Sequence, residues 1–366
     1  MGELRLMKGN EVLAEAAIRC GCDGYFGYPI TPQSEVMETL MDRQPWNETG
    51  MVVLQAESEV AAINMLYGAS GSGKKVMTSS SSPGISLMTE GISYIAGAEL
   101  PCLVVNVQRG GPGLGTIQPS QADYFQAVKG GGHGDYKMIV LAPSSVQEMN
   151  DFVDLAFDLA FKYRNPAMIL TDGAIGQMME KVELSGYKER LTDEEIVEKW
   201  GDWAATGKPS TRDRNIVTSL ELDSFKNELN NIRFKEKYDK MEAEEQRYEA
   251  IHCEDAEYIF VAFGTSARVC EKSVELGRER GYKIGLLRPV TLFPFPKEII
   301  KQLAKNVKGF LSIEMNTGQM LEDIKLAIYE AGIVRRVEHF GRMGGILPNP
   351  SEVLNAMENM FIQKDK

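Results

Sequence analysis

Two glutamates lie where an apolar strand gives way to a helix. The run Val-Val-Leu-Gln at 52–55 is typical of a buried strand, and Ser58 is a suitable N-cap for a helix with Glu59 in its first turn. Because this helix is otherwise apolar, the Glu59 carboxyl is expected to be poorly solvated. Poor solvation raises a carboxyl pKa and suits proton transfer near neutral pH. The alternative is that Glu57 and Glu59 only favour the positive end of the helix.

Thr31 and Arg109 each follow a predicted strand. Thr31 lies between Pro29 and Pro32, which stiffen the turn because each fixes its own φ and restricts the residue before it. Arg109 follows the apolar run 101–107, beside glycines that let a ligand approach the backbone. Ligands of open parallel sheets gather at such strand ends. The competing interpretations are a tight strand-to-helix connection at Thr31 and a surface arginine at position 109.

Two further patterns carry weaker indications of chemistry. His133 lies in a glycine-rich loop at 130–136 and is a candidate catalytic residue, but its spacing from His252 and His339 indicates no metal site. Residues 68–75 nearly match a phosphate-binding loop. The position after Lys74 is not Ser or Thr, and the glycines end a helix, so we interpret them as a helix terminus.

The elements that must position these residues alternate regularly. Strands are predicted at 25–28, 52–55, 75–78, 101–107, 138–142 and 166–171, with a polar loop at 79–84. Helices are predicted to begin near residues 9, 33, 59, 85, 121 and 146. This alternation indicates a parallel sheet with helices on both faces, in a first α/β domain over 1–180.

The pattern changes after residue 180. We predict a linker over 181–254 that contains a long charged helix from Leu222 to Glu249. Strands near 258–263, 285–288, 309–314 and 337–340 then predict a smaller α/β domain over 255–366.

Composition excludes several classes of protein. The 366 residues carry 40 Lys and Arg against 52 Asp and Glu, a net charge of −12, which argues against a nucleic-acid partner. No run is long enough to span a membrane, and the N-terminus lacks a signal-peptide core. Five cysteines without a Cys-x-x-Cys pair indicate reduced thiols, so we expect a cytoplasmic protein.

Several motifs together resemble the alpha subunit of the 2-oxoacid:ferredoxin oxidoreductases. They are Gly27-Tyr28-Pro29-Ile30-Thr31-Pro32, Glu57-Ser58-Glu59-Val60-Ala61-Ala62, Ser82-Pro83-Gly84, Arg109-Gly110-Gly111-Pro112 and Glu314-Met315-Asn316-Thr317-Gly318-Gln319. The forms at 28–35 and 131–136 are most similar to the branched-chain, 2-ketoisovalerate type. The match spans nearly the whole chain.

The resemblance implies a pyrimidine-binding fold followed by a transketolase C-terminal-like domain. By motif position, Glu59 would be the catalytic glutamate that hydrogen-bonds the aminopyrimidine of thiamine diphosphate, with Tyr28 and Pro29 also on the cofactor. Thr31 and Arg109 would bind the substrate carboxylate. The implied reaction converts a 2-oxoacid and coenzyme A to acyl-CoA and CO2, with electrons passing to ferredoxin.

Two absences indicate what the partner subunits hold. A Gly-Asp-Gly…Asn pattern for Mg²⁺ and diphosphate is missing, since Thr171-Asp172-Gly173 has no asparagine downstream, and cluster cysteines are missing too. The resemblance therefore implies a beta subunit with the diphosphate and Mg²⁺ site, gamma and delta subunits with [4Fe-4S] clusters, and a dimer of hetero-oligomers. The loop at 113–119 departs from the family pattern, which leaves its ligand contacts open.

Alternatives of substrate and of class remain. The same chemistry on 2-oxoglutarate, pyruvate or aryl ketoacids is compatible with the motifs. A non-catalytic scaffold with the same fold is a second alternative, and a free-standing nucleotide-binding protein is a third. The joint presence of Thr31, Glu59 and Arg109 favours the enzyme.

Overall fold

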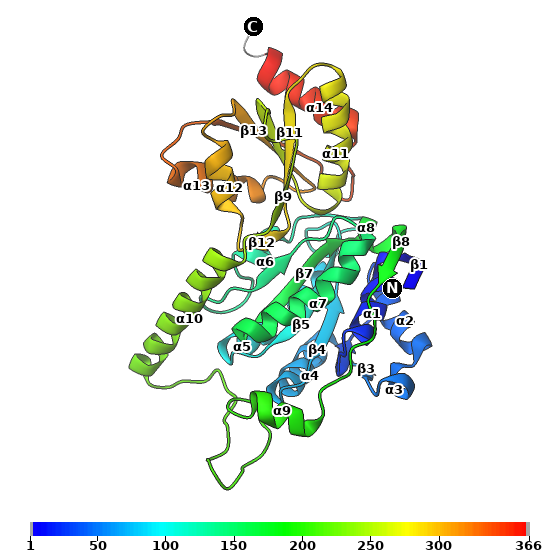
Figure 1. The fold of residues 1–366 in the computed structure, drawn as a ribbon, viewed down its shortest axis with the longest axis vertical. Helices are drawn as coiled ribbons and strands as arrows, with labels where there is room; N and C mark the ends of the chain where they lie inside the picture. Colours follow the sequence, from blue (N-terminus) through cyan, green and yellow to red (C-terminus); the bar gives the residue numbers. More distant parts are fainter. Residues whose placement is uncertain (1–2, 364–366) are drawn as a thin grey trace.

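Two mostly parallel sheets form the framework of the protein (Figure 1). The computed structural model describes residues 3–363. The seven-stranded sheet has the order β12 (Thr291–Phe293), β6 (Ile139–Leu141), β7 (Pro166–Asp172), β5 (Cys102–Gln108), β4 (Val76–Ser80), β2 (Gly24–Gly27) and β3 (Val52–Gln55). The five-stranded sheet has the order β14 (Arg336–Gly341), β13 (Gly309–Glu314), β10 (Tyr258–Val261), β11 (Ile284–Pro289) and β9 (Tyr248–Ile251). Only β12 and β9, each at one edge, run antiparallel to their neighbours in these sheets.

Ten helices lie within residues 3–244, and most of them connect or pack on the strands of the larger sheet. They are α1 (Gly9–Arg19), α2 (Ser34–Arg43), α3 (Pro45–Glu48), α4 (Glu59–Gly71), α5 (Ser82–Gly97), α6 (Tyr124–Val128), α7 (Val146–Tyr163), α8 (Gly173–Gln177), α9 (Asp193–Trp200) and α10 (Ser224–Glu244). Helix α1 packs on α7 and α4 packs on α5, while α5 and α7 both contact β5 and β7. Every residue of β5 and β7 is buried, which explains their nearly continuous apolar sequences.

The smaller sheet is covered by α11 (Gly264–Glu279), α12 (Lys297–Leu303), α13 (Met320–Glu330) and α14 (Pro350–Met357), followed by a π-helical turn at Glu358–Gln363. Chain connectivity does not divide the sheets cleanly. Strand β12 comes from the C-terminal part of the chain yet pairs with β6 of the larger sheet.

Some elements differ from the sequence prediction. The stretch 79–84 is not a loop, because Ser79 and Ser80 end β4 and α5 begins at Ser82, with Pro83 in its first turn, where the missing N–H of proline is not needed. The helix predicted up to residue 249 ends at Glu244, and residues 248–251 pair with β11 instead. An antiparallel ribbon of β1 (Glu3–Lys8) and β8 (Met179–Leu184) was not predicted.

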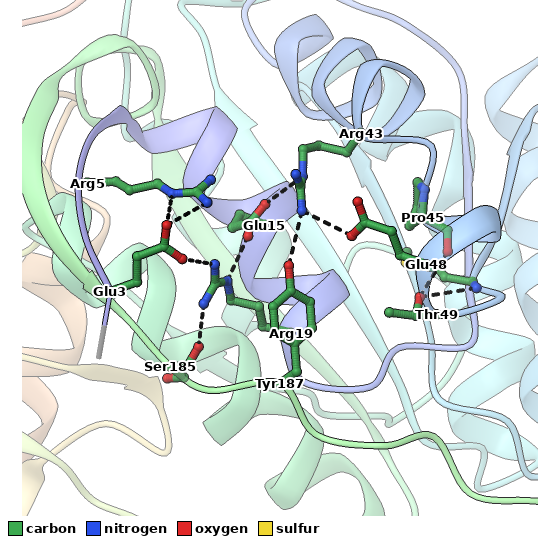
Figure 2. Close-up of polar contacts among 11 residues, drawn as sticks. Glu3, Arg5, Glu15, Arg19, Arg43, Pro45, Glu48, Thr49, Ser185 and Tyr187 are labelled. Carbon is green, nitrogen blue, oxygen red and sulfur yellow. Dashed lines mark hydrogen bonds and ion pairs between the residues drawn. The ribbon is translucent and has the colours of Figure 1, made fainter. Parts of the chain in front are cut away.

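A buried ion network fastens this ribbon to the helices beside it (Figure 2). The Glu15 carboxylate is fully buried and pairs with Arg19 Nε at 2.7 Å and with Arg43 Nε at 3.0 Å. Arg19 also pairs with Glu3 of β1. Because each buried charge has an opposite partner, the network links β1, α1 and α2 without an isolated charge.

Within residues 3–363, no helix combines the length and the apolar character needed to cross a membrane.

Candidate active site

The candidate residues lie where the order of the larger sheet reverses. The chain passes from β2 outward to β3 and then crosses back to β4 on the other side of β2. In open parallel sheets the carboxyl ends of the strands at such a switch point form the usual ligand crevice. Thr31 follows β2, Glu59 follows β3, and Arg109 follows β5, the next strand beyond β4.

A buried hydrogen-bonded chain fixes the turn that carries Thr31. The Tyr25 hydroxyl lies 2.8 Å from the Ser79 Oγ, and this oxygen donates to Gln33 Oε1 at 2.7 Å. The Gln33 amide in turn donates to the Tyr28 carbonyl at 3.1 Å. On the other side, Asn10 donates to the Pro32 carbonyl at 2.7 Å. Burial raises the pKa of Tyr25 to about 12, so its hydroxyl stays protonated in this chain.

The turn itself presents its side chains at different depths. Tyr28 is partly buried, whereas Pro29 and Thr31 are exposed. The predicted cofactor residues Tyr28 and Pro29 are therefore accessible to solvent, and the Tyr28 carbonyl accepts the hydrogen bond from Gln33.

Glu59 begins α4 and turns inward. Ser58 caps the helix by accepting a hydrogen bond from the Ala61 N–H at 3.2 Å, as its position predicts. Glu59 is 7% exposed, and in the part of the chain that the structure describes its carboxylate has no hydrogen bond or ion pair. A Cβ at position 84 would lie 2.8 Å from Glu59 Oε1 and 2.0 Å from Ser80 Oγ. Gly84 is therefore packed closely against Ser80 and Glu59, and only a residue without a side chain fits beside this buried carboxylate.

Arg109 is a buried cation without a carboxylate. It is 7% exposed, and its guanidinium donates to the carbonyls of Thr31 at 2.9 Å and Leu114 at 3.2 Å. Its Nε atom is buried without a partner, and no ion pair neutralises the side chain among residues 3–363. A buried guanidinium in this state is well suited to an anionic ligand, since an unpaired buried charge is unfavourable.

The structure brings Thr31 and Arg109 into direct contact, and it links Glu59 to them through α5. Gly84, which faces Glu59, lies in the first turn of α5, and Ser82 in the same turn accepts a hydrogen bond from the Arg109 N–H at 3.0 Å. Within the described residues no direct bond joins Glu59 to Thr31 or Arg109. A ligand between α4 and the β5 end would thus meet an anion on one side and a cation on the other.

The loop at 113–119 folds back over Arg109. Arg109 forms an isolated bridge with Pro119, and the Gly110 N–H donates to the Gln118 carbonyl at 2.9 Å. Leu114 and Ile117 are 81% and 55% exposed, so the loop presents apolar side chains outward. His133 lies exposed in the neighbouring loop, and the structure gives it no contact with Glu59 or Arg109.

Several polar residues near the site were not singled out from the sequence. Buried side-chain oxygens without a partner occur at the ends of β4, β5 and β7: Ser80 Oγ, Ser81 Oγ, Asn106 Oδ1 and Thr171 Oγ1. Asp123, at the start of α6, accepts hydrogen bonds from Ser82 Oγ at 2.5 Å and from Asn106 at 2.9 Å. The hydroxyl-rich stretch 79–84 was a signal for the serines, whereas nothing local marked Asp123.

Residues that follow strands of the smaller sheet hold the segment around Gln121 in place. Gln121 is fully buried and donates to the Phe263 carbonyl at 2.7 Å, while its Oε1 accepts from the Met315 N–H at 3.0 Å. Asn316 donates to the Gln121 carbonyl at 2.7 Å. The stretch 314–319, which contributed to the resemblance, therefore joins the two parts of the molecule.

Known protein families match almost the whole chain. Residues 15–251 match the model described as pyruvate flavodoxin/ferredoxin oxidoreductase, thiamine diP-bdg. Residues 256–353 match pyruvate:ferredoxin oxidoreductase core domain II.

Individual relatives agree with these models. The ketoisovalerate oxidoreductase subunit VorB of Methanothermobacter thermautotrophicus is 49% identical over 97% of both chains. The 2-oxoglutarate synthase subunit KorA of Methanocaldococcus jannaschii is 35% identical over 97% of this chain and 99% of its own.

Among solved structures, 2-oxoglutarate:ferredoxin oxidoreductase from Magnetococcus marinus, with 2-oxoglutarate, coenzyme A and succinyl-CoA bound, superposes with a TM-score of 0.85 at 26% identity. The match covers 98% of this chain but 65% of that one, so this chain spans about two thirds of the neighbour's length. A split-gene transketolase has the same fold, with a TM-score of 0.60 at 12% identity, 96% coverage of this chain and 97% of its own.

These matches first define a class, the α/β proteins with the thiamine-diphosphate-binding fold and a transketolase-like second sheet. Within that class, the chain belongs to the 2-oxoacid:ferredoxin oxidoreductase family. The sequence prediction of fold and family is confirmed.

Proposed function

We propose that this chain is the subunit that supplies the pyrimidine side of the thiamine diphosphate site in a 2-ketoisovalerate:ferredoxin oxidoreductase. The reaction is the oxidative decarboxylation of the 2-oxoacid to acyl-CoA and CO2, with electrons leaving to ferredoxin. One observation carries the proposal: a buried anion, Glu59, and a buried cation, Arg109, border the same strand ends, and neither has a charged partner among the described residues.

The residues fit a thiamine ring system. The Glu59 carboxylate can accept a hydrogen bond from a ring nitrogen, and the backbone of Gly84 packs close against this carboxylate. Ser80 Oγ, buried and without a partner, lies beside the same glycine. Thiamine diphosphate supplies a nucleophilic carbon and an electron sink for decarboxylation.

The chain's own residues then have separate tasks. Glu59, which is 7% exposed, holds or accepts a proton at its carboxylate. Arg109 binds the carboxylate of the 2-oxoacid by charge-assisted hydrogen bonds, and its contact with the Thr31 carbonyl sets the orientation of the guanidinium. The Thr31 side chain, which is exposed to solvent, is the second group that binds the substrate carboxylate. Tyr28 and Pro29, which are accessible to solvent, would contact the cofactor.

The remaining components belong to partners in this proposal. A beta subunit holds the diphosphate with Mg²⁺, and gamma and delta subunits carry the [4Fe-4S] clusters that reduce ferredoxin. Coenzyme A is the co-substrate. Support comes from the missing Gly-Asp-Gly…Asn and Cys-x-x-Cys patterns in this sequence. A cytoplasmic location agrees with five free, buried thiols.

The decisive experiment compares two neighbouring glutamates. In the complex reconstituted with its partner subunits, Glu59→Gln should lower 2-ketoisovalerate-dependent dye reduction by about 10²- to 10⁴-fold, the usual contribution of a positioned acid or base. Glu57 is exposed and two residues away, so Glu57→Gln is the matched control and should retain activity. Near-normal turnover by Glu59→Gln would instead favour the non-catalytic scaffold.

Substrate choice needs a separate measurement. 2-Oxoglutarate is the second candidate, since a relative at 35% identity is named for that acid. We expect the highest kcat/KM for 2-ketoisovalerate in a panel with 2-oxoglutarate, pyruvate and an aryl ketoacid. A preference for 2-oxoglutarate would change the substrate and leave the reaction class intact.

A further inference from the structure

The hydroxyl group of Ser82 connects the backbone of Arg109 to the carboxylate of Asp123. Ser82 Oγ lies 2.5 Å from Asp123 Oδ2 and 3.3 Å from the Arg109 carbonyl, and it accepts from the Arg109 N–H at 3.0 Å. A hydroxyl has one proton to donate. The shorter, charge-assisted bond to the carboxylate takes it, which turns the oxygen lone pairs toward the Arg109 N–H.

Asp123 also holds the end of β5 directly, and the bond from Asn106 reaches the same oxygen that Ser82 contacts. Asn106 Nδ2 donates to Asp123 Oδ2 at 2.9 Å, and the Asp123 N–H donates to Gln108 Oε1 at 3.1 Å. The residue thus fastens the last residues of β5 from two directions, directly before Arg109. Burial raises the pKa of Asp123, although the bonds from Ser82 and Asn106 oppose this rise.

The segment that carries Asp123 is held by the C-terminal part of the chain on both sides. Before it, Gln121 is bonded to Met315 and Asn316. After it, the Phe125 N–H donates to Gln319 Oε1 at 2.7 Å, and Gln319 Nε2 donates to the Ala122 carbonyl at 2.7 Å. The position of Asp123 therefore depends on residues 315–319.

We propose that Asp123 is a positioning residue for substrate binding. Residues 315–319 hold Asp123, Asp123 holds the Ser82 hydroxyl, and Ser82 fixes the backbone of Arg109; we call this chain of contacts the relay. This inference rests on the proposed function of Arg109 as the group that binds the 2-oxoacid carboxylate. Asp123 acts through Ser82 and is not itself in contact with the substrate.

The test separates substrate binding from turnover. In the reconstituted complex, Asp123→Ala should raise the KM for 2-ketoisovalerate about 10-fold or more, with kcat changed less than about 3-fold, because misplacing a binding group by a fraction of an ångström weakens orientation. Asp123→Asn keeps an acceptor for Ser82 and should recover most of the affinity. Glu322→Gln, an exposed acid on α13, is the control.

Two further variants keep the test decisive. Ser82→Ala removes the relay with a smaller change and should raise KM in the same way even if Asp123→Ala fails to fold. Gln319→Ala should also raise KM, and its combination with Asp123→Ala should be less than additive, as expected of residues that act in one chain. If Ser82→Ala and Gln319→Ala leave KM at the wild-type value, the relay is wrong. If the wild-type complex oxidises no 2-oxoacid, the proposed function itself fails.

Discussion

At the scale of single residues, the site is defined by two charges that the chain buries without neutralising. Glu15, Arg19 and Arg43 contrast with this, because every charge in that buried network has an opposite partner (Figure 2). The same fold pairs the buried charges of α1 but leaves Glu59 and Arg109 without a charged partner at the strand ends, among the described residues. We take this contrast to mark ligand-facing groups.

A conservative change at Arg109 tests the fork geometry. Arg109→Lys keeps the charge but loses the planar pair of donors that reaches Thr31 and Leu114. We expect kcat/KM for the 2-oxoacid to fall about 10- to 100-fold, the effect of losing one hydrogen bond to a charged group. Steady-state kinetics of the reconstituted complex measures this. Arg5→Lys on the exposed ribbon is the control, and equal kinetics for the two variants would contradict the role of Arg109.

Sequence reasoning reached some of these residues and not others. Glu59 was accessible because a strand, a capping serine and an apolar helix are adjacent in the chain. Asp123 was not accessible, because its partners Ser82 and Asn106 are 41 and 17 residues away, and no local pattern records such pairs.

At the scale of elements, the close packing of α4 on α5 sets how near Glu59 lies to the start of α5. The two helices meet where a glycine of α5 faces an isoleucine of α4. A Cβ at position 91 would lie 2.6 Å from Ile63 Cγ1 and Cγ2. Only a residue without a side chain allows this approach, so Gly91 fixes the distance between the helix with Glu59 and the helix with Gly84.

Adding one methyl group should therefore destabilise the pair. Gly91→Ala is expected to lower the free energy of unfolding by about 1–3 kcal/mol through overpacking. Gly68→Ala in α4 is the matched control, since a Cβ there meets no atom within 4 Å and the residue is exposed. It should raise stability by about 0.5–1 kcal/mol, because alanine is the better helix former. Urea unfolding compares the two, and equal effects would contradict the close packing.

Elements whose pattern is local were predictable, and those formed by distant pairing were not. Helix α7 and strands β5 and β7 occur at the predicted places because their apolar periodicity is strong. Strands β1 and β8 pair across more than 170 residues, and β1 exposes Leu4 and Leu6, so its sequence lacks a buried face to recognise. Strand β9 continues the polar character of α10, and its pairing with β11 decides its conformation.

At the scale of the whole molecule, Glu245 connects α7, which packs on the larger sheet, to the segment that leads into β9 of the smaller sheet. Its carboxylate is 4% exposed and lies 2.6 Å from both Lys162 Nζ and Arg247 Nη1. Tyr163 at the end of α7 also donates to it, at 2.8 Å. Burial alone would raise the pKa of Glu245, but the hydrogen bonds from Lys162, Arg247 and Tyr163 outweigh it and lower the pKa to about 2.

This shift predicts a pH dependence with a definite sign. A folded-state pKa below the unfolded value of 4.5 means that the stabilisation is present above that pH and is lost as pH falls toward 2. The difference corresponds to at most about 3 kcal/mol. Glu245→Gln should be less stable than wild type at pH 7, and the gap should narrow as pH falls from 4.5. Unfolding curves measure it against Glu236→Gln, an exposed control on α10; a gap independent of pH would contradict it.

The pairing of β12 with β6 limits where the chain can be cut or joined to a relative. Strand β12 closes the β6 edge of the larger sheet with residues that lie beyond the start of the smaller one. A truncation at residue 251 would remove β12 and leave the backbone N–H and C=O groups of β6 unpaired. Such an exposed edge strand can pair with another chain and cause aggregation. The larger sheet thus needs a strand from the C-terminal part of the chain. In a chimaera of two relatives, residues 291–293 should come from the same parent as the larger sheet that they complete.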